Sequence, residues 1–245
     1  RFFMRQIDDK LNEIIDSKSI HGVIVCSIKN DKIETYSKGT TNGQNLVSLD
    51  TRYDLASLTK IFVTTRIFQL IDNNQLRLDT VVKDIISDFN HDSITISELL
   101  LHTSGMLPSA RPRYELSGKA LLDYIFSMND YVDEQRGQTV YSCINYIILG
   151  EIINHIDKPL DRSINDNILS PLNMTDTSFN GYNAAPTQVL EDGLRIQERV
   201  HDQTAFALGG TAGNAGLFSS MRDLVRFVDG LLNNDSILSP QSRQL

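Results

Sequence analysis

The sequence predicts a mixed α+β (α/β) fold in which antiparallel strands are covered by helices. Two patterns indicate this. A helical pattern followed by two short β-prone runs opens the chain, and helical apolar patterns dominate from residue 57 onward. With 245 residues and 40% hydrophobic content, the chain can form one large domain or two interleaved lobes around a substantial core.

The opening segment predicts a helix packed on a hairpin. Residues 4–18 carry apolar side chains at helical spacing, namely Ile7, Leu11, Ile14 and Ile15. Residues 22–29 and 32–38 are β-prone and are joined through Asn30 and Asp31, which is the signature of a β-hairpin. Residues 40–51 are polar and contain glycine, so we expect a loop there.

The middle of the chain predicts a buried helix over residues 57–71, because its apolar side chains lie on nearly all faces. Shorter helices should follow. The first is capped by Asp79 and ends near Ile86, and the second covers 96–102 behind a Thr95/Glu98 capping box. Two more cover 118–128 and the strongly apolar stretch 141–156. The last is capped by Ser220 with Asp223 and ends near Leu232. Residues 106–117 should form a surface excursion. No linker divides the chain, so we expect a single domain over 1–245.

Composition excludes several function classes. The net charge is −8 and no Lys/Arg cluster occurs, which argues against nucleic acid as a partner. The longest apolar run, 144–153, is too short to span a membrane. The five histidines lack metal-ligand spacing, so neither a metal nor another cofactor is expected. The two cysteines should be free thiols. No secretory pattern opens the chain, which favours a cytoplasmic location over export after removal of a signal.

Ser57 and Lys60 form the candidate catalytic centre. Residues three apart share a helix face, so the hydroxyl and the amine can touch. The start of a helix also offers unpaired backbone N–H groups and the positive end of the dipole, and both stabilise negative charge on an attacking oxygen. The alternative is a serine that only caps the helix.

Five motifs occur in an order that resembles a known family. They are Ala-Ser-Leu-Thr-Lys at 56–60, Leu-Leu-His-Thr-Ser-Gly at 100–105, Tyr-Ser at 141–142, Pro-Leu-Asn-Met at 171–174, and Ala-Gly-Leu-Phe-Ser-Ser at 215–220. Together they resemble the serine beta-lactamase and penicillin-binding protein superfamily, nearest to its class C related branch of esterases and D-aminoacyl peptidases. The resemblance implies an antiparallel sheet flanked by helices plus an all-helical lobe, with the sheet lobe at about 1–55 and 205–245 and the helical lobe at about 56–204.

The resemblance also implies roles for three residues. Ser57 is expected to be the acylated nucleophile, Lys60 the group that activates it, and Tyr141 the group that passes a proton to the leaving group. A core packing role is the alternative for Tyr141. The implied function is a serine hydrolase acting through an acyl-enzyme on an ester, a D-amino-acid peptide or a lactam. A small ester or a cell-wall peptide is favoured over a lactam.

Three further residues are candidate substrate contacts. Cys143 stands where the family usually has an amide-binding asparagine, and a thiol is a weak hydrogen bonder. Asn145 is one helical step further round and is not taken as its replacement. Cys143 could also be a nucleophile or a packing residue. His201 lies in a segment that resembles a loop near the family's pocket, although a structural role is open. His102 is expected to cap or pack at the turn with Thr103 and Ser104.

The family's third motif, Lys or His followed by Thr-Gly on a strand, has no convincing match. Asn214, before Ala-Gly at 215–216, looks similar but precedes the segment that the motif should follow. The resemblance therefore leads us to expect a member whose C-terminal strands are missing and whose catalysis is weak. A penicillin-binding or sensing protein without turnover, and a structural or assembly protein, remain alternatives. The substrate would be a small molecule or peptide, and the oligomeric state is not predicted.

Overall fold

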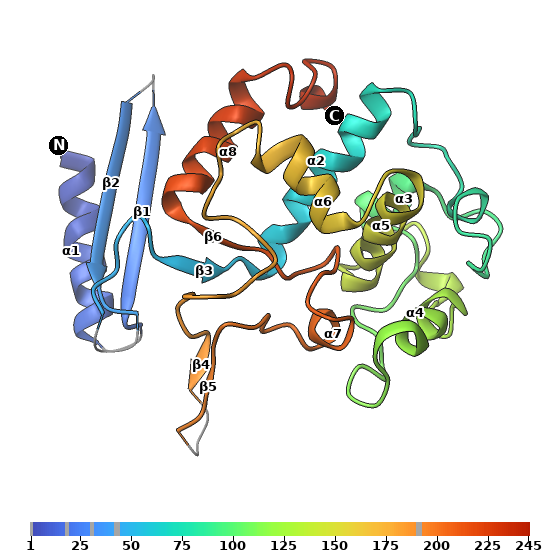
Figure 1. Ribbon diagram of the computed structural model, residues 1–245, viewed down its shortest axis with the longest axis horizontal. Helices are drawn as coiled ribbons and strands as arrows, with labels where there is room; N and C mark the ends of the chain where they lie inside the picture. Colours follow the sequence, from blue (N-terminus) through green and yellow to red (C-terminus); the bar gives the residue numbers. More distant parts are fainter. Residues whose placement is uncertain (1, 18–19, 30–31, 42–44, 190–192) are drawn as a thin grey trace.

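The chain begins with a helix packed on a hairpin at one end of the molecule (Figure 1). The computed structural model describes residues 2–17, 20–29, 32–41, 45–189 and 193–245. Helix α1 (Phe2–Asp16) contacts strand β2 (Lys32–Gly39), which pairs antiparallel with β1 (Gly22–Lys29) along the full length of both strands. The predicted helix and both hairpin strands are confirmed, while Asn30 and Asp31 of the turn lie outside the described residues.

The remaining strands join segments that are distant in the chain. Strand β3 (Arg52–Asp54) pairs antiparallel with β6 (Phe218–Ser220), and β4 (Gln188–Val189) pairs antiparallel with β5 (Arg195–Ile196). Across the described residues the strands thus form three two-stranded antiparallel sheets. The β3–β6 pair holds the segment before Ser57 next to the segment that follows the glycine-rich stretch 208–216. It therefore brings the motifs at 56–60 and 215–220 together.

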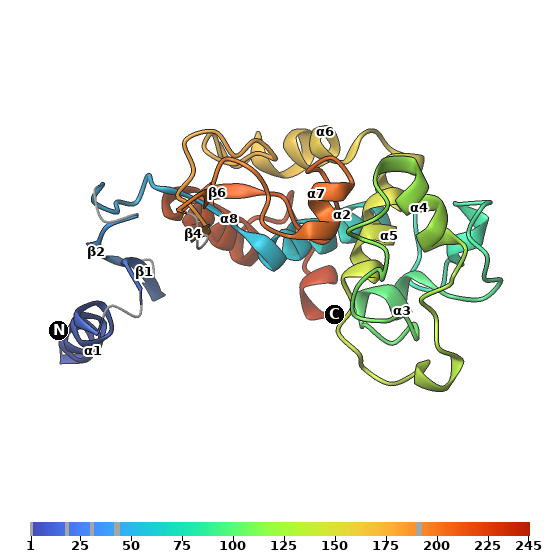
Figure 2. The same cartoon turned by 90° about the horizontal axis from the view of Figure 1, so that it is seen from below.

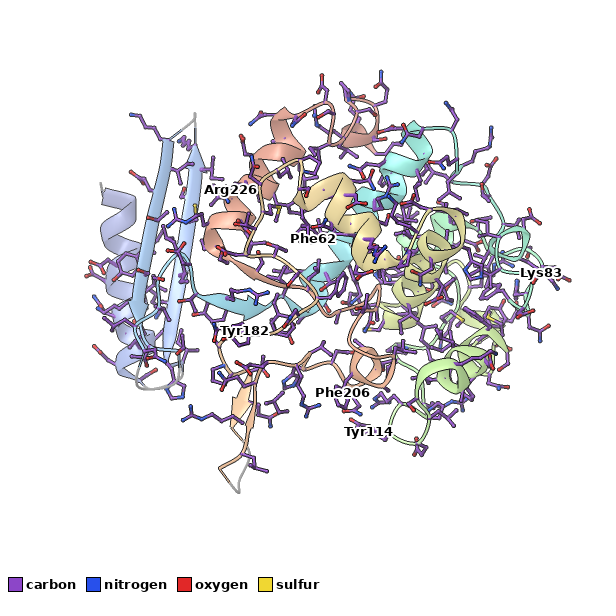
Figure 3. The ribbon with its side chains drawn as sticks, viewed as in Figure 1. Phe62, Lys83, Tyr114, Tyr182, Phe206 and Arg226 are labelled. Carbon is purple, nitrogen blue, oxygen red and sulfur yellow. The ribbon has the colours of Figure 1, made fainter. Side chains whose placement is uncertain are left out.

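Helix α2 (Thr59–Asp72) runs through the middle of the molecule, as its apolar pattern predicts. A single 3₁₀ turn, Ala56–Leu58, precedes it and carries Ser57. The Phe62 ring of α2 stacks on Phe227 of helix α8 (Met221–Asn233) with centroids 3.9 Å apart. Figure 3 places Phe62 near the centre of the molecule. The predicted Ser220 cap of α8 is confirmed, because its side chain accepts from the Asp223 N–H.

Helices α5 (Cys143–Ile156) and α6 (Leu160–Ile164) pack against α2, and α3 (Ile96–Leu100) packs against α5. The chain also forms α4 (Gly118–Phe126) and α7 (Gln203–Ala207). In Figure 2, α3, α4 and α5 lie at the opposite end from α1 and the hairpin. Buried side chains of α2, α3, α4, α5, α6 and α8 form one hydrophobic core. This core includes side chains from both expected lobes, a second small cluster lies around Val200 and Ala205, and the division into lobes stays a prediction.

Two local predictions are wrong. Asp79 does not cap a helix, because its carboxylate pairs with Arg77 and only a 3₁₀ turn, Val82–Asp84, forms after it. The 106–117 segment is not wholly a surface excursion, since Met106 and Ala110 are almost fully buried in the core. The Thr95/Glu98 capping box of α3 is confirmed, with both of its hydrogen bonds present. Among the helices that the structure describes, none has the length and apolar character needed to cross a bilayer.

Candidate active site

Ser57 sits in a strained turn between β3 and α2. The residue before it, Ala56, has φ 47°, in the left-handed region that non-glycine residues rarely adopt. The Asp54 carboxylate accepts the Ala56 N–H at 2.7 Å and holds this turn in place. The second oxygen of Asp54 accepts the His201 N–H at 2.8 Å, so one carboxylate ties the serine turn to the segment before α7. Such strain persists only where surrounding contacts over-determine it, and it clusters at functional sites.

The Ser57 hydroxyl oxygen accepts two hydrogen bonds from side chains. Lys60 Nζ donates at 3.0 Å from the next turn of the same helix, as the three-residue spacing predicts. Tyr141 Oη donates at 2.7 Å from a residue 84 positions away. A hydroxyl in contact with an amine and a phenol has two groups that can exchange protons with it.

Lys60 is held on several sides by its surroundings. It is only 5% exposed, and its ammonium donates to the Asn214 backbone carbonyl at 2.9 Å and to Cys143 Sγ at 3.7 Å in addition to Ser57. It also lies 5.0 Å from the Tyr141 ring centroid and 5.9 Å from that of Tyr146. These contacts fix the nitrogen beside Ser57 without any carboxylate partner among the described residues.

Tyr141 reaches the site from the loop just before α5. Its ring is 52% exposed, so this tyrosine is not a core residue, and the packing alternative fails. The ring lies against that of His102 at an interplanar angle of 36°, with centroids 4.7 Å apart. Ser57 is exposed as well, so an incoming molecule can meet both groups.

The Asn214 side chain is fully buried. Its amide donates to the Asp202 carboxylate at 3.0 Å, and Asp202 also caps α7 by accepting the Ala205 N–H. The backbone carbonyl of Asn214 accepts from Lys60, while its side-chain Oδ1 is buried and has no hydrogen-bond partner among the described residues. The proposed contact between Asn214 and a substrate stays a prediction, and what the structure shows is a carbonyl that positions Lys60.

Gly213 brings the backbone of this loop against α5. A Cβ at Gly213 would lie 1.9 Å from the Tyr146 carbonyl oxygen and 3.0 Å from the Gly150 nitrogen. Only glycine permits this approach, which sets the position of the neighbouring Asn214 carbonyl.

Replacing Gly213 with alanine should therefore disturb both folding and the site. We expect Gly213→Ala to lower the free energy of unfolding by about 2 to 3 kcal/mol through overpacking. It should also slow labelling of Ser57 by an active-site reagent about tenfold, because a hydrogen bond to a charged group is lost. Gly209→Ala is the contrast, because its Cβ would meet open space and only the φ of 94° is strained. Denaturant unfolding and labelling rates measure the two effects; equal behaviour of the variants would contradict the prediction.

Of the other residues considered from the sequence, Cys143 lies in the site, whereas the side chains of His201 and Asn145 bind elsewhere. Cys143 begins α5 and is in contact with Lys60, so the structure brings it into the site. His201 is exposed, and its ring forms a hydrogen bond with Thr187 at 2.8 Å. Its backbone, not its ring, is tied to the serine turn through Asp54. Asn145 is buried and accepts from the Ser104 hydroxyl at 2.5 Å, which agrees with leaving it out of the site.

Two residues of the site were missed or misplaced by sequence reasoning. Asp54 was not assigned a role, although an aspartate two residues before a turn is a known signal for a side chain that binds the backbone. His102 ends α3 as expected, but its ring contacts Tyr141 and the Ser142 N–H instead of Thr103 and Ser104. Within the described residues no three His, Cys, Asp or Glu side chains are grouped to hold a metal ion.

Comparison with known proteins supports the family resemblance. The family model named Beta-lactamase matches residues 7–245. The "Putative D-alanyl-D-alanine carboxypeptidase" of Escherichia coli O157:H7 is 30% identical, with 75% of this chain and 51% of that protein covered. The chain therefore spans about half the length of the curated relatives it matches.

Solved structures share the fold. The octameric penicillin-binding protein homologue from Pyrococcus abyssi superimposes with a TM-score of 0.81 at 20% identity, covering 98% of this chain and 59% of that one. The D-amino acid amidase from Ochrobactrum anthropi SV3 gives a TM-score of 0.78 at 21% identity, covering 97% and 72%. The match over residues 7–245, together with the shared fold, shows that the chain belongs to the beta-lactamase family, within the serine beta-lactamase and penicillin-binding protein superfamily.

Proposed function

We propose that this protein is a serine hydrolase that works through an acyl-enzyme at Ser57. The observation that carries the proposal is the pair of hydrogen bonds to the Ser57 oxygen, from Lys60 at 3.0 Å and from Tyr141 at 2.7 Å. A serine hydroxyl is a weak nucleophile unless an adjacent group takes its proton. Here two groups of the required kind touch the same oxygen.

The proposed reaction has two halves. Ser57 Oγ attacks the substrate carbonyl and its proton passes to Lys60, which takes part as the deprotonated amine and keeps its two N–H groups on the Asn214 carbonyl and Cys143 Sγ. Tyr141 gives its proton to the departing oxygen or nitrogen as the bond from the carbonyl carbon breaks, and it regains a proton from Lys60. Water then attacks the acyl carbon and gives up a proton, the bond from the acyl carbon to Ser57 breaks, and that proton returns to the Ser57 oxygen to restore its hydroxyl.

Charge on the carbonyl oxygen needs stabilisation during both halves. Ser57 lies in the first turn of the continuous helical segment that leads into α2, where backbone N–H groups are free of intrahelical partners and the helix dipole is positive. We assign the Ser57 N–H as one donor to the developing oxyanion. The strained φ of Ala56 supports this assignment, because it sets the direction of the following peptide.

The substrate class we propose is an ester or a D-amino-acid amide or peptide. The names of two similar proteins, a D-alanyl-D-alanine carboxypeptidase and a D-amino acid amidase, support a carbonyl next to a D-amino acid. Cys143 contacts Lys60 at the position where the family's amide-binding asparagine stands, and a thiol binds amides poorly. This favours small esters and D-amino-acid derivatives over lactams with long side-chain amides.

The test is covalent labelling of the protein with a fluorophosphonate and, separately, with a penicillin. We expect at least one of the two reagents to give a single adduct by intact mass, mapped to Ser57 by peptide digestion and absent from Ser57→Ala. Ser87→Ala is the matched control, because Ser87 is exposed and outside the site, and it should label as the wild type does.

Three results would count against the proposal. An adduct that persists in Ser57→Ala and maps to Cys143 would make the thiol the nucleophile. A folded protein that forms no adduct with either reagent would reject the acyl-enzyme. Saturable penicillin binding without an adduct, unchanged in Ser57→Ala, would favour a binding or sensing protein that does not turn over its ligand.

A further inference from the structure

His102 occupies a backbone position that normally belongs to glycine. Helix α3 ends in a Schellman motif, in which the Thr103 N–H bonds to the Glu98 carbonyl at 2.9 Å and the His102 N–H bonds to the Leu99 carbonyl at 3.3 Å. The residue at the left-handed position of this motif is His102, with φ 56°. A histidine there is strained where glycine would not be, so its side chain should contribute something that glycine cannot.

The imidazole of His102 receives two N–H groups at one nitrogen. Its Nδ1 lies 3.0 Å from the Ser142 backbone nitrogen and 3.3 Å from the Asn145 amide nitrogen. The Asn145 oxygen is already the acceptor for the Ser104 hydroxyl, so the nitrogen of this amide is the group that faces His102. Two donors at Nδ1 require that this nitrogen carries no proton. The ring is therefore the neutral tautomer with its hydrogen on Nε2.

The same ring lies against the tyrosine of the site. Its centroid is 4.7 Å from that of Tyr141 and 5.2 Å from that of Tyr146. Among the described residues, the titratable groups that face it are these two phenols and Lys60, and no carboxylate influences it. Burial, and then the positive charge of Lys60, lower the pKa of His102 below its usual value of 6.5. The neutral ring that the hydrogen bonds require is thus also the one its surroundings favour.

We propose that neutral His102 is a positioning residue for Tyr141: it accepts the Ser142 N–H, supports the tyrosine ring, and holds the phenol against Ser57. Protonation of Nδ1 places a third N–H against those of Ser142 and Asn145. The Ser142 backbone then loses its acceptor, and Tyr141, which directly precedes it, loses its support. The site therefore loses activity in acid because His102, which does not itself react, takes up a proton.

This inference rests on the proposed hydrolase function, and it predicts a specific pH profile. In the folded protein His102 becomes protonated only below pH 6.5, because its pKa is lowered. Turnover should therefore fall as the pH drops through the pKa of His102. The loss should be greater for phenyl acetate than for p-nitrophenyl acetate, because a poorer leaving group depends more on the proton that Tyr141 donates.

Three variants separate positioning from folding. His102→Gly suits the left-handed backbone, so it should fold with an unchanged melting transition yet hydrolyse phenyl acetate about tenfold more slowly at pH 8, because the Ser142 acceptor is gone. His102→Asn also tolerates φ 56°, and its Oδ1 can replace Nδ1 as acceptor but cannot titrate. It should recover most of the rate and lack the acidic fall. His91→Asn is the matched control, because His91 also accepts a backbone N–H, contacts a tyrosine and has a lowered pKa, but lies away from the site.

The outcomes are distinct. An acidic fall that is the same in His102→Asn as in the wild type, or a His102→Gly variant with the full rate, would overturn the proposal. If the wild type hydrolyses neither ester, the proposed function fails first, and nuclear magnetic resonance tests His102 alone. The inference then requires a neutral imidazole protonated at Nε2 and Tyr141 ring signals that shift at the His102 midpoint. Tyr141 signals that do not follow that titration would reject it.

Discussion

Lys60→Met should slow acylation of Ser57 by about 10³-fold, because a general base contributes on the order of 10² to 10⁴ in rate. Methionine has nearly the length of lysine but can neither accept nor donate a proton at its end. The Ser57 oxygen would keep the bond from Tyr141 and lose the bond from Lys60. The rate of fluorophosphonate labelling, followed by intact mass, measures this loss directly.

The fold should survive the same substitution. Lys60 is 5% exposed and its described partners are a hydroxyl, a carbonyl and a thiol, so removing the ammonium leaves no buried charge behind. Lys83→Met is the matched control, since Lys83 pairs with the exposed Asp92 at the far edge of the molecule (Figure 3) and should label normally. A Lys60→Met protein that labels at the wild-type rate would remove Lys60 from the proposed mechanism.

Arg66→Met should destabilise the fold by about 3 kcal/mol, because removing one partner of a buried ion pair leaves the other uncompensated. The Arg66 side chain is 4% exposed on α2, and its guanidinium donates to Asp157 at 3.1 Å. It also donates to Ser163 at 2.8 Å and to Gln69 at 3.1 Å. This network joins α2 to the α5–α6 connection. Denaturant unfolding of the two proteins gives the difference.

The effect of Arg66→Met should depend on pH in a defined direction. Burial raises the pKa of Asp157, but hydrogen bonds from Ser163 and Arg66 outweigh it and leave the pKa below its usual value near 3.8. A carboxyl with a lowered folded-state pKa stabilises the fold above its unfolded pKa, and this stabilisation is lost as the pH falls through the folded pKa. The difference between Arg66→Met and the wild type should therefore be full at pH 7 and shrink below about pH 4.

An exposed ion pair supplies the control for Arg66→Met. Arg77 and Asp79 pair at 2.8 Å with side chains that are 78% and 69% exposed. Surface pairs contribute little, so Arg77→Met should leave the free energy of unfolding nearly unchanged. An Arg66→Met protein as stable as Arg77→Met would show that the network contributes no more than a surface pair.

The sequence predicted those features that depend on neighbours along the chain. The hairpin of β1 and β2, the capping box of α3 and the Ser220 cap of α8 are all confirmed. Ser57 and Lys60 touch because residues three apart on a helix share a face. Each follows from the periodicity of side chains and from side chains that bind a nearby backbone N–H. The predicted Asp79 cap failed for a reason that is also local, because Arg77, two residues earlier, binds the same carboxylate.

Only the tertiary structure decided how the site is completed. Tyr141 reaches Ser57 across 84 residues, and the Asn214 carbonyl reaches Lys60 across 154. The second contact depends on two glycines that let the backbones of α5 and the 213–214 loop approach each other. The role of His102 depends on a left-handed φ that turns its ring away from its own turn and toward Ser142. Such contacts are set by the packing of distant segments, which no local pattern of residues encodes.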